Sequence, residues 1–146
     1  MSSPLALYGN MPDIFRAEEG LLKLPQVEFP LQHFYLPGVC VRVMFIPAGS
    51  ALTGKIHKHV HIAILAKGTL RLADAENAVI VEAGYVAYGK PGIKRLGYAE
   101  TDCVFINVLS TDIQDIEELE SELTVDTFDQ YEQFLLEGPR HEKLLK

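Results

Sequence analysis

The stretch from His33 to Leu109 most constrains the fold, because short apolar runs rich in Val, Ile and Phe recur there between Pro, Gly, Asp and Asn positions. Regularly spaced runs of this kind predict an all-β domain that closes into a barrel or a sandwich. We expect strands at 39–46, 55–65, 69–73, 78–82, 85–88 and 103–108. In the first of these both alternating faces are largely apolar, as expected for a strand of a closed, two-layered structure.

Beyond this region the spacing of apolar residues changes from two to about 3.6, which predicts amphipathic helices. Thr111 and Gln114 have the spacing of a capping box at the start of the first helix. A second helix is expected to begin at Asp126 and to end at Gly138-Pro139. The acidic residues of both helices are expected to form their solvated faces.

The changes of pattern divide the chain into residues 1–32, a β-barrel over 33–109 and an acidic helical segment over 110–146. Prolines are too frequent in the first part for a long helix, so we expect it to wrap the barrel or to meet a partner subunit. The net charge is −7, but residues 33–108 carry eight basic and five acidic groups, and residues 111–146 carry three and eleven. A mildly basic middle does not indicate nucleic-acid binding and suits a small anionic ligand.

The length of 146 residues and the 48% hydrophobic content suit one domain with a real core. Cys40 and Cys103 lie far apart in apolar stretches, which predicts buried thiols in a reducing compartment. The N-terminal residues have no secretory signal pattern, and no apolar run approaches the roughly 18 residues of a membrane span. We therefore expect a cytoplasmic protein that does not bind membranes.

Three histidines fall within five residues in the segment GKIHKHVH, residues 54–61. A zinc-protease helix is excluded, because Lys58 stands where that mechanism needs a glutamate base. On a strand, Lys55, His57, His59 and His61 point to one face, where the imidazoles can converge on a metal if the face lines a cavity. The alternative is a set of exposed histidines on an outward face.

The same segment resembles the first motif of the cupin superfamily, in which paired histidines and a glutamate lie between two glycines. With Gly49 and Gly68 at those glycines, Lys55 falls at the first His, His57 at the second His and His61 at the Glu. The resemblance implies a single cupin-type barrel, a double-stranded β-helix or jelly roll, followed here by the C-terminal helices.

The second cupin motif is similar to residues 84–95, with Gly92 at the turn and Arg95 at the third His. The whole match spans residues 47–107. The sequence of this segment also resembles small single cupins of tailed bacteriophages and their hosts, mostly without an assigned activity. The similar stretches are PAGSALTGKIHKHVHIAILAKG and KPGIKRLGYAETD. Cupins frequently pair through sheet edges or exchanged terminal strands, so the resemblance implies a homodimer or a higher homo-oligomer.

The departures from the motif change the expected chemistry, because cations replace two of the four metal ligands. Charged Lys55 and Arg95 cannot bind a metal, but they suit a carboxylate or phosphate. Arg42 and Lys94 are additional candidates for this anion site. A divalent metal (Zn, Mn, Fe or Ni) held by His57 and His61, with His59, water or a ligand completing the shell, remains an alternative.

Three hypotheses follow for the function. In the leading hypothesis the pocket captures a small anionic molecule, such as a nucleotide or a sugar acid, through Lys55, His57, His61 and Arg95. If the protein is phage-encoded, this capture would sequester the ligand in the host cytoplasm. The second is a cupin enzyme of isomerase, lyase or oxygenase type, metal-dependent or metal-free, with His61 as the acid or base. The third is a structural or interaction protein with a vestigial pocket. The weaker site candidates are His33, Tyr88, Tyr98 and Asn107.

Overall fold

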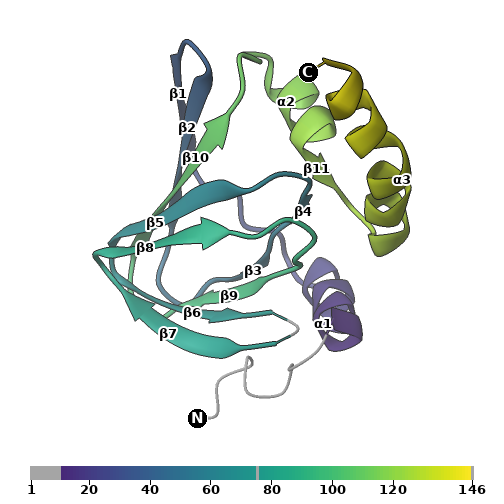
Figure 1. The fold of residues 1–146 in the computed structure, drawn as a ribbon. Helices are drawn as coiled ribbons and strands as arrows, with labels where there is room; N and C mark the ends of the chain where they lie inside the picture. The colour runs from purple at the N-terminus through teal and green to yellow at the C-terminus, as the bar shows by residue number, and fades with distance from the viewer. Residues whose placement is uncertain (1–10, 75, 146) are drawn as a thin grey trace.

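The structure is a computed structural model that describes residues 11–74 and 76–145. Two antiparallel sheets and a short two-stranded ladder form an open-ended barrel (Figure 1). Its elements, in chain order, are α1 (Met11–Leu22), β1 (Leu31–Leu36), β2 (Val39–Ile46), β3 (Ala51–Thr53), β4 (Ile56–His57), β5 (His61–Lys67), β6 (Thr69–Ala73), β7 (Ala78–Glu82), β8 (Tyr85–Gly89), β9 (Leu96–Ala99), β10 (Cys103–Ser110), α2 (Ile116–Leu123), β11 (Thr124–Val125) and α3 (Phe128–Leu145).

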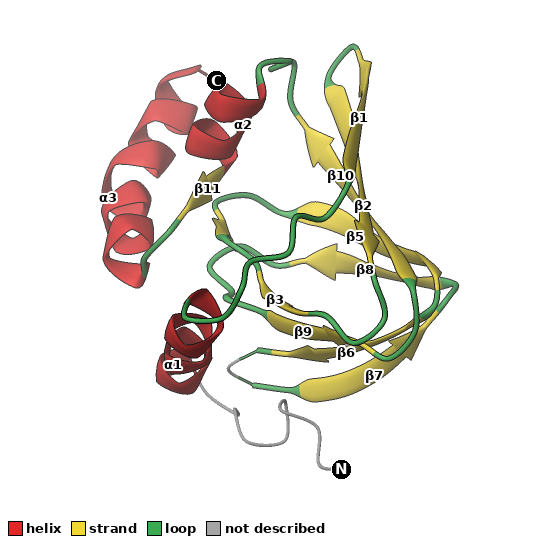
Figure 2. Cartoon of the chain, turned by 180° about the vertical axis from the view of Figure 1, so that it is seen from behind, coloured by secondary structure: helices red, strands yellow, loops and turns green. Residues whose placement is uncertain are grey.

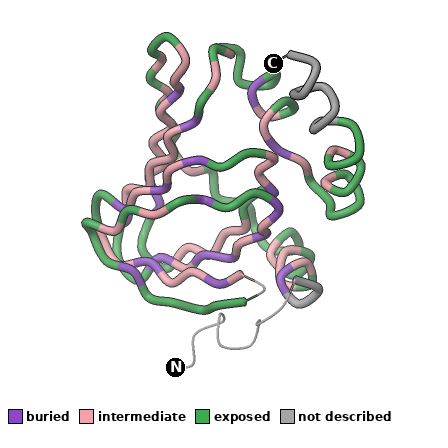
Figure 3. Tube along the Cα trace, viewed as in Figure 1, coloured by how far each residue is buried: buried purple, intermediate pink, exposed green. Residues whose placement is uncertain are grey.

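The five-stranded sheet has the order β1-β2-β10-β5-β8 and the four-stranded sheet the order β3-β9-β6-β7. Apolar side chains from both sheets fill the space between them, and Leu65, Leu70 and Cys103 are among the buried members of this core. Figure 3 shows buried positions on the barrel strands and at the points where α1 and α2 meet the barrel. The mainly β architecture with C-terminal helices agrees with the prediction.

Gly68 allows the tight connection between β5 and β6. Its φ is +92°, and a Cβ at this position would lie 2.3 Å from the carbonyl oxygen of Asp102. Glycine is therefore required here for both backbone conformation and space.

The predicted strands at 39–46, 69–73 and 78–82 coincide with β2, β6 and β7, and β8 and β10 extend one and two residues beyond their predicted ends. The structure adds β1, β3, β9 and β11, which we did not predict. β3 and β9 have three and four residues, too few for a pattern of alternating polarity to stand out.

The prediction of one continuous strand over 55–65 is wrong. β4 pairs with β11 near the C-terminal end of the chain, whereas β5 pairs with β10 and β8 in the five-stranded sheet. The chain bends over residues 58–60 to change from one ladder to the other, and the alternation of faces is lost there. His59 therefore does not share a face with His57 and His61.

An N-terminal helix, α1, lies within the segment in which the prolines argued against a long helix. Pro12 is in its first turn, where a proline costs no intrahelical hydrogen bond. Ile14 of α1 is fully buried against Ala73 and Leu96 of the barrel. The helix is thus held by apolar packing on the four-stranded sheet.

The first C-terminal helix, α2, begins later than predicted. Its N-cap is Asp115, whose side chain accepts a hydrogen bond from the backbone N–H of Glu118, so Thr111 and Gln114 do not form the cap. Leu119 of α2 is buried with Cys40 and Leu109. α2 therefore covers the inner side of the β1-β2-β10 extension.

The second C-terminal helix, α3, continues through Gly138-Pro139 to Leu145, which corrects the predicted end. A proline inside a helix removes one backbone hydrogen bond and clashes with the carbonyl four residues earlier, so the predicted end at this position was reasonable although the helix continues through it. All three helices lie on the same side of the barrel (Figure 2). Within the described part of the chain, none of them is long and apolar enough to cross a membrane. Cys40 and Cys103 are both buried free thiols, as expected.

Candidate functional site

A cavity of about 120 Å³ lies between the two sheets at the end of the barrel where β4 enters. Its walls are largely apolar, with Met44, Leu70 and Phe105 among the lining residues. Its polar lining side chains are Lys55, His57, His61, Lys90, Arg95 and Asn107. The structure thus brings together all four leading candidates from the sequence.

The two histidines enter the cavity from different strands. His57 ends β4 and His61 begins β5, and their rings stack with centroids 4.0 Å apart and an interplanar angle of 29°. Gly89 of β8 pairs with His61 across the sheet, and a Cβ at residue 89 would lie 2.0 Å from the His61 ring. The absence of a side chain at position 89 therefore makes room for the imidazole.

Both histidines are held in the neutral form. Burial lowers the pKa of His57 to about 3, and the positive charges of His61, Arg42 and Arg95 act in the same direction. Burial also lowers the pKa of His61, aided by Arg95 and opposed by a hydrogen bond to the backbone of His59. At pH 7 each neutral ring presents one N–H donor and one nitrogen acceptor.

Lys90 is the exposed cation of the cavity wall, and the other two, Arg95 and Lys55, are in different electrostatic situations. Arg95 has no ion-pair partner among the described residues. Lys55 Nζ lies 3.6 Å from Glu120 Oε2 and 3.6 Å from Asp126 Oδ1, and its side chain is half exposed. Arg95 is therefore the uncompensated positive charge of the cavity.

Two buried polar atoms of the cavity lack a hydrogen-bond partner in the described structure, His61 Nδ1 and Asn107 Oδ1. A buried polar atom without a partner costs about 1–3 kcal/mol, so such atoms are uncommon outside sites that bind water or a ligand. Asn107, a weaker candidate from the sequence, thus belongs to the site.

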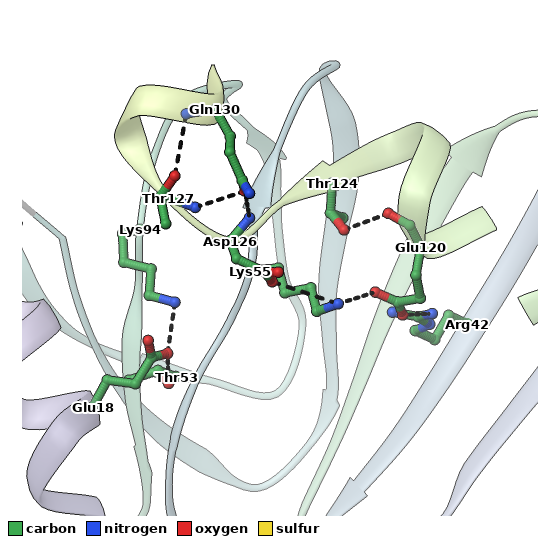
Figure 4. A network of polar contacts seen from close by, with 10 residues as sticks. All are labelled: Glu18, Arg42, Thr53, Lys55, Lys94, Glu120, Thr124, Asp126, Thr127 and Gln130. Atoms are coloured by element: carbon green, nitrogen blue, oxygen red, sulfur yellow. Dashed lines mark hydrogen bonds and ion pairs between the residues drawn. The ribbon is translucent and has the colours of Figure 1, made fainter. Parts of the chain in front are cut away.

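A network of ion pairs joins the mouth of the cavity to the C-terminal segment (Figure 4). Glu120 of α2 accepts a hydrogen bond from Arg42 Nη2 and is also the partner of Lys55. The prediction that the acidic residues of the helices face solvent is therefore wrong for Glu120, whose side chain is only 25% exposed.

The remaining candidates lie outside the cavity wall. Arg42 is beside it, bound to Glu120, and donates from Nε to His33 Nε2 at 3.1 Å. Lys94 is 2% exposed and donates to Glu18 Oε2 at 2.6 Å, on the side of α1. Tyr88 is 70% exposed and points away from the barrel interior. Their roles as ligand-binding residues stay predictions.

His59, the expected third metal ligand, is exposed and lies edge-on to the ring of Phe134 at 5.5 Å between centroids. The described residues contain no group of three or more His, Cys, Asp or Glu side chains able to hold a metal ion. Lys55 and Arg95 stand near the two remaining imidazoles and oppose a divalent cation. The donor set does not fit a cupin metal centre.

A wider groove of about 640 Å³ adjoins the cavity and runs between residues 21–29 and the barrel. Lys55 lines both spaces, so its ammonium group marks the boundary between them. Neither Lys90 nor Gly89 was predicted, because neither falls on a position of the cupin motifs that carries a ligand.

No model of a known protein family matches the sequence, and no curated protein sequence does. Solved structures with the same fold include KdgF from Halomonas sp., with a TM-score of 0.53 and 14% identity over 63% of this chain and 88% of that chain. A cupin superfamily protein from Desulfitobacterium hafniense has a TM-score of 0.51 and 6% identity, with 64% and 86% of the chains covered.

An uncharacterised protein with a double-stranded β-helix domain from Klebsiella pneumoniae also has a TM-score of 0.51, with 16% identity over 60% of this chain and 80% of that one. At these identities the similarity concerns the fold. The expectation from the motif is confirmed at this level, and the likeness to phage proteins stays a prediction. The barrel of this chain therefore has the double-stranded β-helix fold that these cupin structures also have.

Proposed function

We propose that the cavity binds a small organic anion of the hydroxy-acid or sugar-acid class. The observation that carries this proposal is the presence, in one small cavity, of an unpaired Arg95 and of two unpartnered buried polar atoms, His61 Nδ1 and Asn107 Oδ1. A guanidinium binds a carboxylate through two parallel hydrogen bonds. A hydroxyl group on the same ligand donates to Asn107 Oδ1, or accepts from His61 Nδ1 when that nitrogen carries the ring proton.

The volume of the cavity limits the size of this ligand. Drug-sized and cofactor pockets hold about 300–1,000 Å³, whereas this cavity holds about 120 Å³. A water molecule occupies about 30 Å³ in the liquid, so the space accommodates the bulk of about four waters. This supports a small acid and argues against a whole nucleotide inside the barrel.

The electrostatics of the site favour an anion over a neutral molecule. His57 and His61 are uncharged, so the positive potential of Arg95, with a share from Lys55, faces a low-dielectric cavity. A charge interaction is much stronger there than in water. The apolar walls then surround the carbon part of the ligand.

The test is calorimetric titration of the full chain at pH 7 with hydroxy acids and sugar acids of two to four carbons, each paired with its amide or alcohol. We expect the acids to bind and the neutral analogues to fail. Arg95→Met should weaken binding about 10- to 100-fold, since a hydrogen bond to a charged group contributes about 1.5–3 kcal/mol. Arg71→Met is the matched control, because Arg71 pairs with Glu100 and does not line the cavity. Equal affinity of the wild type and Arg95→Met would contradict the proposal.

A metal-free acid–base enzyme is the second candidate, and the unpartnered Nδ1 of a neutral His61 favours it. A neutral imidazole accepts a proton from the carbon next to a carboxylate, and Arg95 stabilises the enolate that forms. Exchange of that proton with D2O, followed by NMR of the ligand, distinguishes the two functions. If the proton exchanges in the wild type and His61→Gln abolishes the exchange, the protein is an enzyme. If the acid binds without exchange, the protein only captures it.

A further inference from the structure

The groove beside the cavity differs from the cavity in its charge. The described residues that line the cavity include three cations and no Asp or Glu. The groove is lined by two cations and two carboxylates, which pair with each other (Figure 4). Lys94 Nζ lies 2.6 Å from Glu18 Oε2. Lys55 Nζ lies 3.6 Å from Asp126 Oδ1. The cavity therefore attracts an anion, whereas the charges of the groove compensate one another.

The polar side chains of the groove are largely engaged within the protein. Gln26 Nε2 donates to the carbonyl oxygens of Leu21 and Leu24, at 3.0 and 2.8 Å. The hydroxyl group of Thr53 donates to the carboxylate of Glu18. A polar ligand would give up hydrogen bonds to water here and find few side chains to replace them, which is unfavourable. The groove therefore suits an apolar group.

The side chains that residues 21–29 contribute to the groove are apolar, apart from Gln26. This part of the chain leads from α1 toward β1 and runs past the barrel (Figure 2). Leu22, Leu24 and Val27 are 65%, 58% and 60% exposed, although all three are large apolar residues. Apolar side chains that gather along a concave surface are typical of a binding site.

The groove and the cavity meet at Leu52, Gly54 and Lys55, which line both spaces. The backbone N–H of Gly54 donates to the carbonyl oxygen of Arg95 at 3.1 Å, so this boundary lies directly beside the arginine of the site. A Cβ at residue 54 would meet no atom within 4 Å. A chain attached to an acid in the cavity can therefore pass Gly54 and enter the groove.

We propose that the cavity and the groove form one bipartite site for an amphipathic acid, with its carboxylate at Arg95 and its apolar chain in the groove. This inference rests on the proposed function and names the ligand class, a hydroxy acid with an alkyl chain longer than four carbons. The cavity volume of about 120 Å³ limits only the part of the ligand inside the barrel, and the groove offers about 640 Å³ for the rest.

The first test is calorimetric titration of the full chain with 2-hydroxy acids of three, four, six and eight carbons, each beside the 1,2-diol of the same length. Fully burying one methylene group raises an affinity about four-fold. In an open groove we expect about two- to four-fold for each methylene beyond four carbons. The diols should bind at least about 10-fold more weakly than the acids, since they lack the carboxylate that Arg95 binds.

The double variant Leu24→Ser/Val27→Ser tests the groove alone, because neither residue lines the cavity. Both side chains are exposed, so the variant should stay folded. We expect it to bind the eight-carbon acid at least about five-fold more weakly and the three-carbon acid as the wild type does. Leu36→Ser/Val86→Ser is the matched control, since these residues are 66% and 62% exposed and line neither space.

Equal affinity for the three- and eight-carbon acids would overturn the bipartite site and leave the proposed function intact, whereas failure of every acid to bind would overturn both. A long diol that binds as tightly as its acid would also contradict the proposal, because the carboxylate would then not direct binding. NMR locates the chain directly. The terminal methyl group of the bound eight-carbon acid should show NOEs to the methyl groups of Leu24 and Val27. NOEs to Met44 and Leu70 alone would place the chain inside the barrel and refute the proposal.

Discussion

Lys55 Nζ lies 3.6 Å from Glu120 Oε2, although the two residues are far apart in the sequence and belong to the barrel mouth and a C-terminal helix. The same carboxylate binds Arg42, and Asp126 lies equally close to Lys55. A carboxylate of the protein thus holds a cation that borders the cavity. An incoming anion competes with Glu120 for the ammonium group of Lys55.

Replacing Glu120 with Gln should therefore increase the affinity for a small acid by several-fold, because Lys55 is released toward the cavity. The same change removes the charge partner of Arg42, whose side chain is 11% exposed. We expect the free energy of unfolding to fall by about 1–3 kcal/mol. Calorimetry and urea denaturation measure the two effects, and Glu117→Gln, in the exposed first turn of α2, is the control. Unchanged affinity would mean that Glu120 does not compete with the ligand.

Gly89→Ala should abolish ligand binding without unfolding the barrel. The added methyl group would lie 2.0–2.6 Å from three atoms of the His61 ring, so the ring must leave its place. We expect the affinity for the acid to fall at least about 10-fold, since His61 then makes no hydrogen bond to the ligand. NMR of the histidine ring nitrogens reports the displacement directly.

The control for this change is Gly20→Ala in α1, where an added Cβ meets no atom within 4 Å. It should leave binding unaltered and raise the stability by about 0.5–1 kcal/mol, because alanine favours the helix over glycine. Loss of binding in both variants would point to a general effect on folding and not to the His61 ring.

The free energy of unfolding should fall as the pH drops below about 6.5, because His57 is protonated in the unfolded chain and not in the folded one. The folded-state pKa is depressed to about 3, so between pH 6.5 and pH 3 the unfolded chain binds a proton at this residue that the folded chain does not. The contribution of His57 to the free energy of unfolding is fully present above pH 6.5 and decreases by about 1.4 kcal/mol per pH unit below it. From pH 7 to pH 5 this amounts to about 2 kcal/mol, and His61 acts in the same direction.

The measurement is urea denaturation at pH 7 and pH 5 for the wild type and His57→Gln. Because glutamine does not titrate, the variant should lose about 2 kcal/mol less than the wild type over this interval. The difference between the two proteins isolates His57 from the carboxylates, which are common to both. Equal losses would show that His57 is protonated in the folded state.

The sequence predicted those parts of the site that follow from local spacing. The strand pattern placed Val39–Ile46 in a two-faced, buried environment, and the spacing of the cupin motifs placed Lys55, His57, His61 and Arg95 around one cavity. The first inference needs only the period of a strand, whereas the second depends on the resemblance to the cupin motifs, which alone places Lys55 and Arg95 at ligand positions.

The remaining features depend on contacts between distant segments. β4 pairs with β11, which breaks the predicted strand and turns His59 away from the other histidines. Arg42 binds Glu120, 78 positions later, so an acidic residue assigned to solvent became part of the site. Hydrophobic periodicity indicates which face of a helix is buried, but it does not indicate which polar residue finds a partner across the fold.

The ion pair of Lys94 and Glu18 should anchor α1 to the barrel. The Lys94 side chain is 3% exposed and its Nζ lies 2.6 Å from Glu18 Oε2, with the ring of Phe15 at 5.2 Å. Glu18→Ala would leave a buried ammonium group without its counter-charge, which costs about 3–5 kcal/mol. We expect a loss of this size in denaturation experiments, while Glu19→Ala, an exposed neighbour on the same helix, should change the stability by less than about 0.5 kcal/mol. The double variant Glu18→Ala/Lys94→Met should recover much of the loss, because no unpaired charge then remains. If the single variant were as stable as the wild type, the Lys94 ammonium group would be reaching solvent, and α1 would be held by the apolar packing of Ile14, Ala17 and Leu21.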